Sequence, residues 1–126
     1  MNYNVFPSTL NSSEIRVPGD KSISHRALIF GAIANGMSSF TGFLSSNDCL
    51  ATLRAFQNMG LVISHDNTNL RVHGLGLNGL KNSSVPHDLG NSGTAVRLLA
   101  GLLAAQDFDS TLPVSYSHLR AHATKA

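Results

Sequence analysis

Apolar positions along the chain recur at helical spacing in three separate stretches. The predicted helices are residues 22–34, a stretch that follows residues 45–48 and ends at Gly60, and a stretch that follows residues 90–93 and ends near residue 105. Asn35-Gly36 is a typical C-terminal stop for the first helix. The apolar side chains of the second step by three residues along it: Leu50, Leu53, Phe56 and Met59.

Short strand-like runs lie between these helices. We expect four strands, of which the last two form a hairpin: residues 14–17, 39–44, 61–64 and 70–73. The turn Pro18-Gly19 ends the first strand, and a glycine-rich loop over residues 74–82 follows the last. Strands and helices of this length that alternate along a chain predict an α/β (α+β) layer architecture.

The starts of the first and third predicted helices share a sequence pattern at a fixed offset. Gly19 and Gly90 are 71 residues apart, and so are Arg26 and Arg97. Each copy has a turn, small or polar residues, an arginine one turn later and an apolar helix body. Two interpretations are open: all such junctions look alike, or a supersecondary unit is duplicated, with one copy and the start of another present here.

Composition excludes several classes of protein. The 126 residues carry a net charge of +2 with 13% charged residues and no dense Lys/Arg cluster, which argues against nucleic-acid binding. The longest apolar run, residues 98–105, is too short to span a bilayer, and no signal peptide is visible at the N-terminus. The single Cys49 excludes an internal disulfide framework. We therefore expect a soluble cytoplasmic protein with no nucleic-acid or membrane partner.

The excess charge is confined to the C-terminal tail. Residues 1–113 contain seven basic and seven acidic groups, so the +2 comes from Arg120 and Lys125 alone. Residues 114–126 show no apolar period of 2 or 3.6, and no element is predicted for them.

The start of the first helix has the chemistry of an anion site. A helix that begins near Ser22 presents unpaired backbone N–H groups and the positive end of its dipole, and Lys21 adds an ammonium there. Ser22 and Arg26 are four residues apart and share a face, so a hydroxyl and a guanidinium point the same way. These groups suit a small molecule with phosphate or carboxylate groups. The alternative is a Ser-capped surface helix with solvated Lys21 and Arg26.

The start of the third helix repeats this logic. Gly93 lets backbone amides approach an anion, and Asn91 or Thr94 can donate a hydrogen bond. The alternative is a helix capped by Asn91, with Arg97 solvated. Spacing alone does not tell whether the two junctions meet.

Other polar residues give weaker signals. The scattered histidines have no metal-ligand spacing and are expected to be ordinary surface or half-buried residues: His25, His65, His73 and His87. Cys49 is predicted to be a buried structural thiol. Asp48 either caps its helix or faces a ligand, and capping is favoured. No metal site is predicted.

Residues 18–36 and 89–103 resemble, in order and separation, the two N-terminal signatures of the 5-enolpyruvylshikimate-3-phosphate synthase family. The resemblance runs to about residue 112. It implies a fold of repeated βαβαββ units, about one and a half of them present here. It also implies transfer of the enolpyruvyl group of phosphoenolpyruvate to the 5-hydroxyl of shikimate 3-phosphate, by a monomer without metal or organic cofactor.

The resemblance also implies roles for individual residues. Lys21 would be catalytic and contact both substrates, while Ser22 and Arg26 would bind shikimate 3-phosphate. Gly93 would lie against phosphoenolpyruvate. The remaining implied positions around the site are Asn91, Thr94 and Arg97.

The chain departs from the family after residue 112. The next family signature, which supplies a phosphoenolpyruvate-binding arginine, is absent, and members are several times longer. We therefore divide the chain into residues 1–112, the N-terminal part of the fold, and residues 113–126, an atypical tail expected to be foreign or frame-shifted. Two other functions stay open: an inactive anion-binding or partly folded fragment, and a relative of the UDP-N-acetylglucosamine enolpyruvyl transferase.

Overall fold

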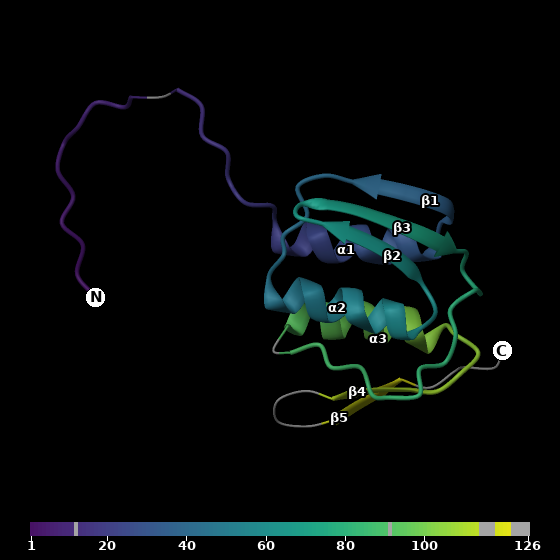
Figure 1. Cartoon of the computed structure of the whole chain (residues 1–126). Helices are drawn as coiled ribbons and strands as arrows, with labels where there is room; N and C mark the ends of the chain where they lie inside the picture. Colours follow the sequence, from purple (N-terminus) through teal and green to yellow (C-terminus); the bar gives the residue numbers. More distant parts are fainter. Residues whose placement is uncertain (12, 91, 114–117, 122–126) are drawn as a thin grey trace.

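The computed structural model describes residues 1–11, 13–90, 92–113 and 118–121. These residues form three helices and five strands in the order α1 (Lys21–Ile33), β1 (Asn35–Phe40), α2 (Asn47–Asn58), β2 (Val62–Asp66), β3 (Asn69–Leu75), α3 (Gly93–Ala104), β4 (Ser110–Pro113) and β5 (His118–Ala121) (Figure 1). Within this described part, no helix is both long and apolar enough to cross a membrane.

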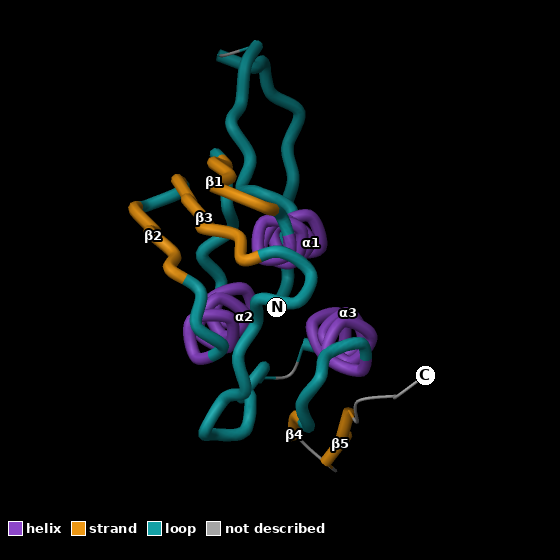
Figure 2. Tube along the Cα trace, turned by 90° about the vertical axis from the view of Figure 1, so that its right-hand side faces the viewer, coloured by secondary structure: helices purple, strands orange, loops and turns teal. Residues whose placement is uncertain are grey.

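The elements are arranged in layers. β1, β3 and β2 form an antiparallel sheet in that order, with Ser38 opposite Val72 and Ile63 opposite the same residue on the other side. α1 and α2 cover one face of this sheet, α3 packs on the side of α1 away from the sheet, and the β4–β5 hairpin lies beyond α3 (Figures 1 and 2). The described elements therefore stack in the order sheet, α1 with α2, α3 and hairpin.

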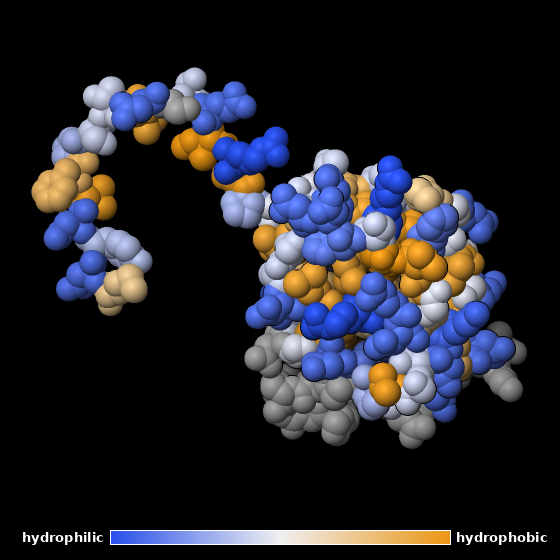
Figure 3. All heavy atoms as spheres, viewed as in Figure 1, coloured by the Kyte–Doolittle hydropathy of each residue, from blue (hydrophilic) through white to orange (hydrophobic). Residues whose placement is uncertain are grey.

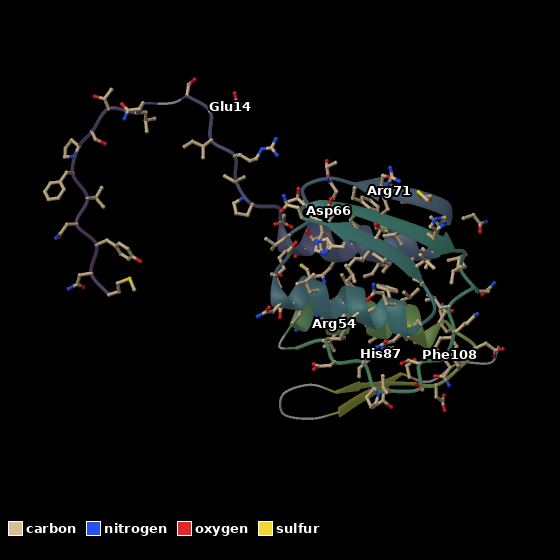
Figure 4. The ribbon with its side chains drawn as sticks, in the orientation of Figure 1. Glu14, Arg54, Asp66, Arg71, His87 and Phe108 are labelled. Atoms are coloured by element: carbon tan, nitrogen blue, oxygen red, sulfur yellow. The ribbon has the colours of Figure 1, made fainter. Side chains whose placement is uncertain are left out.

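The core draws buried side chains from the sheet and from all three helices. In β3, Leu70 and Val72 are buried while Arg71 and His73 point outward, because alternate side chains face opposite sides of a strand. Figure 4 shows Arg71 on the outer side of the sheet. The helices contribute four of the largest fully buried side chains of the described residues: Phe56, Leu28, Leu99 and Leu103. Burying each of these stabilises the fold by about 1.5–3 kcal/mol.

The structure confirms all three helices and the β2–β3 hairpin, but it changes the first two strands. Residues 14–17 form no strand, and Ile15 and Val17 are exposed in an arm that leads away from the body (Figure 3). A strand needs a neighbour for its N–H and C=O groups, and none of the described strands lies beside this arm.

β1 occupies residues 35–40 rather than the predicted 39–44. Asn35-Gly36, predicted as a helix stop, ends α1 and at once begins the strand, because Gly36 has a φ of +113° that permits an abrupt change of direction. α1, β1, α2, β2 and β3 thus reproduce the expected βαβαββ unit without its first strand. Part of the tail without periodicity forms β5, which pairs with β4.

Candidate functional site

The three helices begin at the same end of the molecule. α1, α2 and α3 run in the same direction in Figure 1, and Figure 2 shows them nearly end on. Each has an N-cap side chain that accepts a backbone N–H three residues later, at 2.8 Å from Ile23, 3.3 Å from Cys49 and 3.1 Å from Ala95. The positive ends of three helix dipoles therefore lie close together.

The N-caps are partly those predicted. Ser46 caps α2 and lies within residues 45–48, after which the second helix was predicted to begin. α1 is capped by Asp20 and not by Ser22, because the Asp20 carboxylate precedes the helix in an extended backbone and reaches the Ile23 N–H. α3 is capped by Ser92 and not by Asn91, the cap in the alternative interpretation of this helix start; Asn91 itself lies outside the described residues.

His25 joins the three helix starts from within the core. Its Nδ1 lies 3.0 Å from Thr52 Oγ1 in α2, and its Nε2 lies 3.3 Å from the Oγ of Ser92, the cap of α3. Cys49 Sγ is 3.9 Å from the same Nε2. The two sequence junctions, 67 residues apart at His25 and Ser92, therefore meet in space.

The hydrogen bonds of the neighbours determine which nitrogen of His25 carries the proton. Thr52 donates its hydroxyl proton to the Asp48 carbonyl at 3.3 Å, so it accepts a proton from His25 Nδ1. Ser92 accepts the Ala95 N–H and donates its own proton to Nε2. The hydroxyl groups of Thr52 and Ser92 and the Nδ1–H of His25 then each have one acceptor, so these hydrogen bonds fit a neutral His25 ring protonated at Nδ1.

The prediction that the histidines are ordinary surface or half-buried residues is wrong for two of them. His25 is fully buried and His87 is 2% exposed, while His65 and His73 are exposed. His87 lies beside β4, where its backbone N–H donates to the Thr111 carbonyl at 3.1 Å (Figure 4). Burial lowers the pKa of His87, and burial together with the Lys21 charge lowers the pKa of His25.

We expect the free energy of unfolding to fall as the pH drops below about 6.5, the ordinary histidine pKa. There the unfolded chain binds protons at His25 and His87 that the folded chain excludes, at a cost of up to about 1.4 kcal/mol per pH unit for each. Urea unfolding at several pH values between 7.5 and 5 measures this slope. His25→Asn should flatten it and the exposed-site control His73→Asn should not; equal slopes in the two variants would contradict the assignment.

Lys21 is held at the helix starts by an ion pair. Its Nζ lies 2.6 Å from Oδ2 of Asp48, and the two side chains are 45% and 28% exposed. The hydrogen bond to Asp48 raises the pKa of Lys21 above its ordinary value, so the ammonium is charged at neutral pH. The favoured prediction that Asp48 caps α2 is wrong, because Ser46 is the N-cap of this helix.

Ser24 is a contributor that sequence reasoning missed. Its Oγ donates to the Asp20 carbonyl at 2.7 Å and accepts the Leu44 N–H at 3.0 Å, which ties α1 to the segment before α2. Gly19 lies at the same contact, since a Cβ there would be 1.9 Å from the Gly42 carbonyl oxygen. The only local signal was a serine inside the first turn of a predicted helix.

The structure describes all but one of the other predicted site residues. Ser22 and Thr94 are half-buried in the first turns of α1 and α3. Gly93 begins α3 in open space, with no atom within 4 Å of a Cβ placed on it. Arg26 and Arg97 are exposed, and their guanidinium groups make no hydrogen bond or ion pair to any described residue. Cys49 is buried, as predicted.

The arrangement suits anions rather than metal ions. Three helix starts, an ammonium and two guanidinium groups on exposed helix positions favour negative charge. Among the described side chains, no group of three or more His, Cys, Asp or Glu residues is placed to hold a metal ion.

Comparison with known proteins assigns the family. The sequence model described as EPSP synthase (3-phosphoshikimate 1-carboxyvinyltransferase) matches residues 7–115, and both helix-start motifs lie within that match. The chain belongs to the EPSP synthase family. This confirms the resemblance predicted from residues 18–36 and 89–103.

Relatives from the EPSP synthase family are similar along most of this chain. The chain is 53% identical to the 3-phosphoshikimate 1-carboxyvinyltransferase of Ruthia magnifica over 108 residues, which is 86% of this chain and 25% of that protein. It is 54% identical to the enzyme of the same name from Legionella pneumophila strain Corby over 121 residues, 95% of this chain and 28% of the relative. The chain thus spans about a quarter of the length of these relatives.

A solved structure of the EPSP synthase family has the same fold. EPSP synthase from Acinetobacter baumannii superimposes with a TM-score of 0.77 at 50% identity, over 82% of this chain and 24% of that chain. The mixed architecture of helices and strands predicted from the sequence is therefore confirmed.

Proposed function

We propose that this chain is the N-terminal part of an enzyme that transfers the enolpyruvyl group of phosphoenolpyruvate to the 5-hydroxyl of shikimate 3-phosphate, with release of phosphate. The observation that carries the proposal is the meeting of both family motifs at one place, where His25 Nε2 and Ser92 Oγ are 3.3 Å apart. Both substrates are anions, and the helix starts with Lys21 form a positive locus.

The proposed roles follow the positions of the side chains. Lys21, at the first position of α1, contacts both substrates through its three N–H donors. Ser22 and Arg26 lie on one face of α1 and bind the phosphate of shikimate 3-phosphate by a hydroxyl and a guanidinium fork. Gly93 leaves its backbone open to phosphoenolpyruvate. Thr94 and Arg97 of α3, together with Asn91, complete the surroundings.

We expect the isolated chain to bind substrate with negligible turnover. The candidate site is open on one side, since Gly93 faces open space and Lys21 is 45% exposed. Transfer of the enolpyruvyl group requires a proton donor and groups that exclude water from the reacting carbon, and an open site excludes no water. Phosphate release from the two substrates should match that of Lys21→Ala, and release clearly above that control would contradict this expectation.

Titration with shikimate 3-phosphate, followed by chemical shifts of the full chain, tests the site. Lys21→Gln should weaken binding about tenfold or more, because a charge-assisted hydrogen bond is worth about 1.5–3 kcal/mol. Lys81→Gln is the matched control, since it removes an equal charge from an exposed lysine whose backbone N–H is bonded to Met59, beyond the end of α2. UDP-N-acetylglucosamine should not bind. Equal binding by both variants, or preference for the nucleotide sugar, would refute the proposal.

A further inference from the structure

The carboxylate of Asp48 lies among all three helix starts. Asp48 is the second residue of α2, and its Oδ2 is bound to Lys21 at the start of α1 at 2.6 Å. Its Oδ1 is 3.3 Å from the position that a Cβ would take on Gly90, in the turn that leads into α3. One side chain therefore places a negative charge next to the ammonium and within reach of α1, α2 and α3.

The surrounding charges explain why a carboxylate is stable there. Each helix start carries a partial positive charge, and an acidic group in the first turn of a helix is favourable. Lys21 adds a full positive charge, and no other ion pair to it exists within the described residues. The buried His25 ring is not a competing positive charge, because burial and the neighbouring Lys21 charge lower its pKa and favour the neutral form. Asp48 is thus the anion that this locus holds when no ligand is bound.

We propose that Asp48 is a displaceable counter-ion that sets the anion affinity of the substrate site. When a phosphate group binds, the Lys21 ammonium exchanges the Asp48 carboxylate for a phosphate oxygen, and when the phosphate leaves, Asp48 takes the ammonium back. Without this carboxylate, three helix starts and one ammonium attract the anion together, and bound phosphate is released slowly. Asp48 is therefore a positioning residue that acts through Lys21, and this inference rests on the function proposed above.

Charge scaling separates this role from a structural one. The electrostatic energy between a fixed charge and a ligand is proportional to the ligand charge, so removal of Asp48 acts twice as strongly on a dianion as on a monoanion in free energy. Sulfate and nitrate are suitable probes because neither changes its charge between pH 6 and 8. A change of packing has no reason to follow this ratio.

The test is anion titration of the full chain and its variants at fixed ionic strength, followed by chemical shifts. Asp48→Asn should tighten sulfate binding about tenfold and nitrate binding about threefold, the square root of the sulfate effect. Asp107→Asn is the matched control: the exposed Asp107 lies beyond the C-terminal end of the twelve-residue α3, about 18 Å from its start, and should change neither by more than about twofold.

Lys21→Gln separates the failure of this inference from failure of the proposed function. If sulfate binding depends on Lys21 but Asp48→Asn equals Asp107→Asn, or its sulfate and nitrate gains are equal, the role of Asp48 is refuted while the substrate site stands. If Lys21→Gln leaves sulfate binding unchanged, both in the parent chain and in Asp48→Asn, then the role of Asp48 and the proposed substrate site are both refuted. Should circular dichroism show that Asp48→Asn is unfolded, Asp48→Ser, which keeps an oxygen acceptor in the first turn of α2, is tested for the same gains.

Discussion

Replacing Gly19 with alanine is expected to destabilise the fold by about 3 kcal/mol, near the upper end of the cost of overpacking. A Cβ at this position would lie 1.9 Å from the Gly42 carbonyl oxygen and 3.3 Å from the Leu44 nitrogen. Both are backbone atoms, which cannot rotate away as the end of a side chain can. The start of α1 would have to move away from the segment that leads into α2.

Because Lys21 and the Asp20 cap follow Gly19 directly, the same variant should also lose sulfate binding. Urea unfolding and sulfate titration of the full chain measure the two effects. Gly101→Ala is the matched control: Gly101 lies inside α3 with no atom within 4 Å of an added Cβ, so alanine should stabilise by about 0.5–1 kcal/mol. A Gly19→Ala chain as stable as the parent would show that the close backbone approach is not required.

Truncating Phe56 to alanine is expected to lower the free energy of unfolding by about 3–5 kcal/mol. Phe56 is the largest fully buried side chain of the described residues and belongs to the hydrophobic core through α2. Its removal loses the transfer free energy of the ring and leaves a cavity that the neighbours fill only in part. Because the free energy of unfolding of a small domain is only about 5–15 kcal/mol, this substitution removes a large share of it.

Phe30→Ala provides the comparison, since it is the same substitution in a helix at a side chain that is 63% exposed. Its effect should stay within about 0.5 kcal/mol, as is usual for surface positions. Equal losses for Phe56→Ala and Phe30→Ala in chemical unfolding would contradict the assignment of Phe56 to the buried core.

The elements that the sequence predicted correctly are those whose signals are local. The apolar steps from Leu50 to Met59 place α2, and the turn residues between β2 and β3 specify their hairpin, because neighbouring residues determine both. Residues 14–17 have a strand-like composition but form no strand, because strand pairing depends on a partner from elsewhere in the chain. β1 begins four residues early because Gly36 joins it directly to α1.

The candidate site shows the same division. Both motifs were visible in the sequence, since Lys21, Ser22, Arg26 and Gly93 stand at predicted helix starts, and their substrate roles stay predictions. His25 gave no such signal, because burial of its ring requires α2 and α3 to pack on α1. The pairing of Lys21 with Asp48 has the same origin, as the two residues belong to different helices.

The amino-acid sequence by itself determined the three helices, the hairpin, the family and the positions at which an anion can meet a helix start. These properties depend on residues within a few positions of one another, and the order of the side chains specifies them. Only the tertiary structure decided that the three helix starts converge on His25 and that Asp48 neutralises Lys21. Both depend on parallel packing of helices that are far apart in the chain, and burial and charge act through space regardless of sequence distance.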